Sequence, residues 1–154
     1  MDYNWNWNVF WDFAPGESSS YLQWLVTGTS WTLATTLAAF ILAFVIGGLV
    51  GTLRTSTLRP LVWLGNLYTE VFRNIPLLVQ MFVIYHGFAQ FEWVRDSVAW
   101  PFLKSAWFCA VAAFAINTCA YTTEILHGAI KAVPAGEVEA ARALGMGRWM
   151  AFRR

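Results

Sequence analysis

The sequence is poor in charged residues and in cysteine. Of its 154 residues, 12% are Asp, Glu, Lys or Arg, and the formal net charge is +1; a soluble domain carries about 25% charged residues. Without a run of basic residues, so small a net charge disfavours a nucleic-acid-binding protein, and so high an apolar content disfavours a disordered chain. Two cysteines, Cys109 and Cys119, are too few for a disulfide scaffold.

Motifs of several enzyme classes are missing as well. No G-x-x-x-x-G-K-[ST] phosphate loop occurs, so we do not expect the chain to bind and hydrolyse ATP by that route. His86 and His127 stand alone, and no Cys/His cluster has the spacing of metal ligands. No Ser/His/Asp or paired-carboxylate arrangement is present either. We therefore expect no catalytic residue, no metal and no cofactor in this chain.

Apolar residues dominate what is present. They make up 58% of the chain and include ten tryptophans, more than a protein of this size can cover with polar surface. About 20 apolar residues cross a bilayer, so the length suits about three spans. We predict an all-α, multi-pass membrane fold, with an N-terminal segment at 1–20, spans at about 29–53, 61–90 and 105–126, and a loop at 127–154.

Two local features refine the predicted spans. Pro76 lies inside the second span and lacks a backbone donor, which predicts a bend near Arg73. Gly47 and Gly51 form a GxxxG pattern in the first span, which indicates close packing against another helix.

Orientation follows from the distribution of Lys and Arg, which cytoplasmic loops hold in excess. Residues 1–20 contain neither, so we place the N-terminus on the outer, periplasmic side. Arg54 and Arg59 follow the first span and place that loop inside. The basic residues after 126 place the tail, including residue 154, in the cytoplasm.

Polar residues within the spans fall on two helix faces. Glu70, Arg73 and Asn74 share one face at i, i+3, i+4, and Asn117, Tyr121 and Glu124 share another at i, i+4, i+7. Two interpretations stay open: a Glu70–Arg73 ion pair with polar contacts between helices, or faces that line a solute path. The candidate pathway residues are Glu70, Arg73, Asn74, Gln80, Asn117, Tyr121 and Glu124.

The tail contains a short predicted helix of about ten residues. Pro134 suits its first position, Glu137 and Glu139 favour its first turns, and Gly145 is a natural stop. Its alanines would let the backbone of another protein approach closely. From the residues alone, an amphipathic surface helix is the alternative.

Three motifs resemble one family. Glu139-Ala140-Ala141, followed after three residues by Gly145, resembles the EAA loop of permease subunits of bacterial ATP-binding-cassette (ABC) importers. Residues 68–80 (YTEVFRNIPLLVQ) and 117–134 (NTCAYTTEILHGAIKAVP) resemble the second and third spans of polar amino-acid permeases of the histidine/glutamate type. His127 and Glu137 depart from the residues most frequent there, and neither departure weakens the resemblance.

The resemblance implies a fold, partners and a location. It implies the transmembrane fold of type I ABC importers, with three of the family's five helices and a cytoplasmic coupling helix. It implies a bacterial inner-membrane permease without enzymatic activity that works with ATPase subunits, which bind ATP and Mg. The other implied partners are a second permease subunit, identical or paralogous, a periplasmic solute-binding protein, a polar amino acid and the lipid bilayer, but no nucleic acid. The implied coupling residues are Pro134, Gly136, Glu139, Ala140, Ala141, Leu144 and Gly145.

The resemblance also predicts what is carried. Residues 1–7 and 21–25 resemble the glutamate/aspartate permease subunit, which favours an acidic amino acid. The third span and the tail are closer to permeases for histidine, arginine or opines, so basic amino acids or histidine are the alternative. Outside this family, a membrane scaffold without a solute path and a small channel are the rivals. The family pattern continues with Ile-x-Leu-Pro beyond Arg154, so we expect two further spans to be missing.

Overall fold

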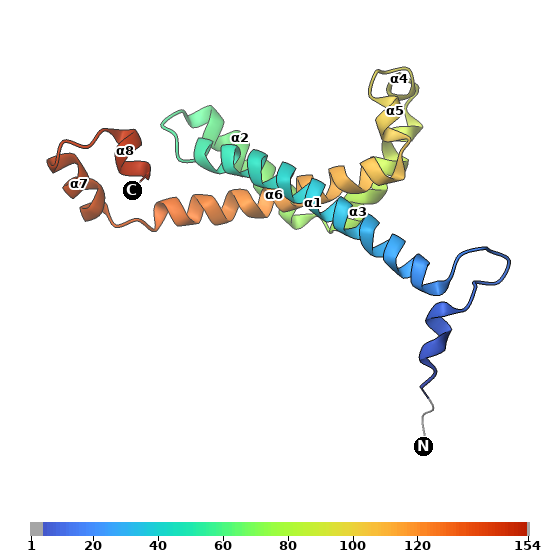
Figure 1. Ribbon diagram of the computed structural model, residues 1–154. Helices are drawn as coiled ribbons and strands as arrows, with labels where there is room; N and C mark the ends of the chain where they lie inside the picture. Colours follow the sequence, from blue (N-terminus) through green and yellow to red (C-terminus); the bar gives the residue numbers. More distant parts are fainter. Residues whose placement is uncertain (1–4, 154) are drawn as a thin grey trace.

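The computed structural model describes residues 5–153, and it is built from helices (Figure 1). Within those residues, β-pairing is limited to an isolated bridge between Phe13 and Ser20. The predicted all-α class is therefore confirmed. The helices are η1 (Trp7–Trp11), α1 (Tyr21–Leu53), α2 (Arg59–Asn74), α3 (Leu77–Phe82), the π-helical η2 (Val83–Gly87), η3 (Phe88–Gln90), α4 (Glu92–Arg95), α5 (Trp100–Leu103), α6 (Ala106–Lys131), α7 (Ala135–Ala143) and α8 (Arg148–Arg153).

Two of these helices, α1 and α6, are each long and apolar enough to cross a membrane. A third candidate is the pair formed by Arg59–Asn74 and Leu77–Gln90, which is bent by 101° at the break between them. The predicted bend is confirmed, and it falls where Pro76 cannot donate a backbone hydrogen bond. The limits predicted for the N-terminal segment, the spans and the loop stay predictions.

Helices α1 and α6 run side by side in the same direction (Figure 1). The α2–α3 segment, which connects them in the sequence, leads the chain back to the start of α6. Near the start of α6, the Trp107 indole donates to Oγ1 of Thr35 in the middle of α1 (2.9 Å). Further along, a Cβ placed on Gly47 would lie 2.8 Å from Thr122 Cβ, and one on Gly51 would lie 3.2 Å from Leu126 Cβ. The close packing predicted from the GxxxG pattern is confirmed.

An alanine at position 47 is expected to loosen this packing. Its methyl group would overlap Thr122 and approach the Cys119 carbonyl oxygen to 3.0 Å, so one helix must shift. Overpacking of this kind lowers the free energy of unfolding by about 1–3 kcal/mol. Thermal unfolding in detergent measures the loss. Gly48→Ala is the matched control because the nearest atom lies 3.8 Å from its Cβ. Equal stability of the two variants would contradict the packing described here.

The tail helix α7 ends in a Schellman motif. Gly145 has φ +75°, which suits glycine, and it ends the helix as predicted. Its N–H donates to the Arg142 carbonyl (3.0 Å), and the N–H of Met146 donates to the Ala141 carbonyl (3.0 Å). At the other end, Pro134 is the N-cap, with an extended ψ of 136°, and the helix begins at Ala135. The prediction that Pro134 opens the helix is wrong by one position.

Candidate functional site

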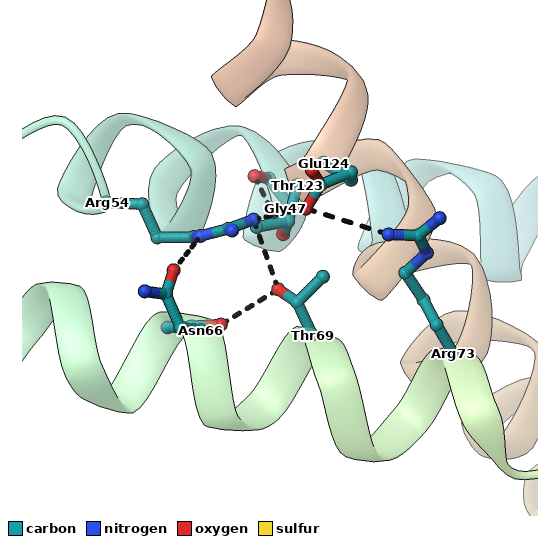
Figure 2. A network of polar contacts seen from close by, with 8 residues as sticks. Gly47, Arg54, Asn66, Thr69, Arg73, Thr123 and Glu124 are labelled. Carbon is teal, nitrogen blue, oxygen red and sulfur yellow. Dashed lines mark hydrogen bonds and ion pairs between the residues drawn. The ribbon is translucent and has the colours of Figure 1, made fainter.

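A cluster of polar side chains lies where α1, α2 and α6 meet (Figure 2). We call it the Arg54 cluster. It consists of Arg54 from the end of α1, Asn66, Thr69 and Arg73 from α2, and Glu124 from α6. Arg54 is only 9% exposed, so its charge requires partners.

Those partners are supplied by two helices. Arg54 Nε donates to Asn66 Oδ1 (2.8 Å), and its Nη1 donates to Glu124 Oε2 (2.8 Å) and to Thr69 Oγ1 (3.4 Å). The Thr69 hydroxyl donates in turn to the Gly65 carbonyl (2.8 Å), which leaves its oxygen free to accept. Gly65 also makes the room: a Cβ there would lie 2.5 Å from Arg54 Cγ.

The cluster holds two positive charges and one negative charge. The guanidinium of Arg73 lies 3.7 Å from Glu124 Oε2, opposite Arg54, and 5.4 Å above the ring of Tyr121. Both Arg73 and Glu124 have 41% of their side chains exposed. Arg54 and Arg73 therefore share one carboxylate, which joins all three helices and leaves a net charge of +1.

A second set of polar contacts supports the break between α2 and α3. In a continuous helix, the Phe72 carbonyl would accept from residue 76, which is a proline. Instead it accepts from Gln80 Nε2 (2.8 Å) and Asn117 Nδ2 (3.3 Å). Gln80 Nε2 also donates to the Ile75 carbonyl (2.8 Å). These amides thus satisfy backbone groups that the bend would otherwise leave unpaired.

The predicted pathway residues separate into three groups. Arg73, Tyr121 and Glu124 lie together in or beside the Arg54 cluster, and Gln80 and Asn117 lie at the helix break. Glu70 and Asn74 are exposed, and neither makes a side-chain hydrogen bond or ion pair within residues 5–153. The open alternative of a Glu70–Arg73 ion pair is therefore wrong, since Arg73 faces the carboxylate of Glu124. Contact of the predicted pathway residues with a solute stays a prediction.

Three members of the cluster were missed from the sequence. Arg54 was used only to orient the first loop, although it is the first charge after a long uncharged run. Asn66 and Thr69 precede Arg73 at the i, i+3, i+7 spacing of one helix face, and this was the signal available.

Within residues 5–153, no group of three or more His, Cys, Asp or Glu could hold a metal ion.

The predicted coupling residues lie around α7, beside a cavity of about 1040 Å³ between this helix, α1 and α6. Glu137, Val138, Ala141 and Arg142 line that cavity. At 100° per residue, Gly136, Glu139, Ala140 and Ala143 fall on the opposite face, which we call the outer face of α7. Pro134 and Gly145 bound the helix, and Leu144 is 77% exposed. Of the predicted set, Ala141 thus points to the cavity rather than outward.

Comparison with known proteins defines the class. Residues 43–154 match the family described as "Binding-protein-dependent transport system inner membrane component". This stretch contains the Arg54 cluster, the helix break and α7. The chain belongs to this family.

Individual relatives are named for amino-acid and opine transport. The chain is 52% identical over 102 residues to the octopine transport system permease protein OccM of Rhizobium radiobacter, covering 66% of this chain and 42% of the relative. It is 40% identical over 129 residues to the arginine ABC transporter permease protein ArtM of Escherichia coli, covering 83% and 58%. A crystal structure of an amino acid ABC transporter with histidines matches with TM-score 0.64 and 33% identity, covering 89% of this chain and 63% of that one. The chain thus spans less than two thirds of these relatives, and they do not support the glutamate/aspartate prediction.

Proposed function

We propose that this chain is part of the permease of an ABC importer for polar amino acids. The observation that carries the proposal is the family match over residues 43–154, which includes the helix break, the Arg54 cluster and α7. The importer would take its energy from ATP bound and hydrolysed by separate ATPase subunits. The chain would supply part of the path and the surface on which an ATPase acts.

We propose basic amino acids as the substrate class. Support comes from the relatives, which are named for octopine, nopaline and arginine transport. The main prediction from the sequence, an acidic amino acid, rested on residues 1–7 and 21–25, which lie outside the family match. Basic amino acids or histidine, the alternative from the sequence, are therefore the better-supported prediction.

The proposed assembly has the N-terminus on the periplasmic side of the inner membrane. A solute-binding protein would deliver the amino acid there, and a second permease subunit would complete the path. The tail after α6, with its basic residues, would face the cytoplasm. An ATPase subunit would bind the outer face of α7, whose small side chains permit close approach.

The structure offers a route from α7 to the spans. Helix α7 follows α6 after only residues 132–134, so a displacement of α7 would act directly on the end of α6. Glu124 lies near that end and binds Arg54 of α1 and Arg73 of α2. The three helices would therefore move as one unit. ATP binding would favour one of two states of this unit, inward-open or outward-open, and so drive alternating access.

Uptake by the assembled importer tests the substrate class. We expect ATP-dependent uptake of labelled arginine, reduced by excess unlabelled arginine and much less by excess glutamate. Vesicles with ATP omitted are the control for passive flux. Uptake of glutamate in preference to arginine would contradict the proposed substrate, whereas arginine flux independent of ATP would contradict the importer itself and favour a channel.

A further inference from the structure

Residues 5–13, which we call the aromatic segment, expose an unusual amount of apolar surface. The sequence WNWNVFWDF contains five aromatic residues and one charge, Asp12. Its six large apolar side chains are between 36% and 70% exposed: Trp5, Trp7, Val9, Phe10, Trp11 and Phe13. Exposed patches of this kind mark contact with a protein or a membrane. The segment lies outside residues 43–154, which match the family.

The aromatic segment has a defined conformation. Residues Trp7–Trp11 form the helix η1, and the Asn6 side chain accepts a hydrogen bond from the Asn8 N–H (3.1 Å) at its start. The rings of Trp5 and Trp7 stack with centroids 5.6 Å apart, and those of Trp7 and Phe10 with centroids 6.1 Å apart. The rings thus support one another while staying exposed.

A loop closed by the bridge between Phe13 and Ser20 brings the segment back beside the first turn of α1 (Figure 1). The Tyr21 N–H donates to the Asp12 carbonyl (3.2 Å), and the Ala14 N–H donates to the Ser19 carbonyl (3.1 Å). The Trp24 indole N–H then bonds back to Ser19 Oγ (2.8 Å). Because of these bonds, the height of the aromatic segment in a bilayer is set by the height of the start of α1.

The length of α1 bears on where its start lies in a bilayer. Its 33 residues span about 50 Å, whereas the hydrocarbon core of a bilayer is about 30 Å thick. The helix exceeds the core by about 20 Å, which is enough for its first turn to lie in the headgroup region, where Trp rings are most favourable. No Lys or Arg occurs before Arg54, so the aromatic segment and the start of α1 offer no basic side chain to anionic lipid.

We propose that the aromatic segment is a membrane-interface anchor: its rings insert between lipid headgroups beside the start of α1 and fix the depth and tilt of that helix. The partner is the lipid surface itself, bound through apolar and aromatic contact rather than through charge. This inference depends on insertion of α1 and not on which amino acid is carried.

Depth measurement by spin labelling tests the proposal on the full chain in phosphatidylcholine bilayers. The native cysteines, Cys109 and Cys119, are buried and would be replaced by alanine. Labels would then be attached at Phe13→Cys in the aromatic segment and at Ser18→Cys in the exposed turn beside it. We expect the ratio of oxygen to water-soluble nickel accessibility to be several-fold higher at position 13 than at position 18.

Four outcomes would contradict the proposal. Low ratios at both positions 13 and 18 would place both in water. A label at position 13 that becomes protected only when a solute-binding protein is added would make the segment a protein-docking surface. A Leu37→Cys label outside the hydrocarbon would show that α1 is not inserted. Adding anionic lipid is expected to leave the depth at position 13 unchanged, and a marked deepening would contradict binding without charge.

Discussion

Replacing Glu139 by lysine is expected to abolish most ATP-driven uptake while leaving the chain in the membrane. Glu139 is exposed on the outer face of α7, where an ATPase subunit is proposed to bind. We take a basic group of the ATPase subunit as the partner of Glu139, so that a lysine would bring like charges together at the interface; this costs several kcal/mol, and 1.4 kcal/mol already weakens binding tenfold. We expect uptake to fall by about tenfold or more. Initial rates in membrane vesicles, normalised to the amount of inserted chain, measure the effect.

Glu137→Lys is the matched control. It makes the same charge change two residues earlier, on the side of α7 that lines the cavity. It removes a favourable charge from the first turn, worth about 0.3–1 kcal/mol, and therefore affects the helix modestly. We expect this variant to keep most of its uptake. If the two variants behave alike, the outer face of α7 has no special role in coupling.

Replacing Arg54 by methionine is expected to have the largest effect on stability. The change leaves the Glu124 carboxylate with only the more distant Arg73, and it removes the donor to Asn66. Breaking a buried ion pair costs about 3–5 kcal/mol, and we expect the lower end because Glu124 is partly exposed. Thermal unfolding in detergent would show the loss as a clearly lowered midpoint.

The double variant Arg54→Met/Glu124→Gln separates the ion pair from simple packing. With both charges removed, no carboxylate is left without its partner, so part of the lost stability should return. We expect the double variant to be more stable than the sum of the two single changes predicts. Strictly additive losses would mean that Arg54 and Glu124 do not interact as described.

Local features of the fold could be predicted from the sequence because each depends on neighbouring residues. Pro76 placed the bend, and Gly145 placed the end of α7. Gly47 and Gly51 predicted a close contact without naming the partner, which is α6. The amides at the break were not predicted as donors to the Phe72 carbonyl, and one of them, Asn117, lies 45 positions away on α6.

The Arg54 cluster could not be predicted in this way. Arg54 and Glu124 are 70 positions apart, and only the packing of three helices brings them to 2.8 Å. Spacing along one helix suggested an ion pair between Glu70 and Arg73. The carboxylate that Arg73 faces is instead that of Glu124, on α6. Spacing likewise cannot tell which face of α7 meets the bundle. The cavity side, with Ala141, is known only from the position of α7 relative to α1.

Site-specific cross-linking tests most directly the central claim, that α7 is the surface on which an ATPase subunit acts. Ala140→Cys lies on the outer face of α7, and Ala141→Cys lies on the cavity side of the same helix. In membranes that contain the assembled importer, a short thiol-reactive photo-cross-linker at each position would be activated with and without ATP. We predict a cross-link to the ATPase subunit from position 140 that is much stronger than from position 141 and changes with ATP. No cross-link from either position, or equal cross-links from both, would contradict the account.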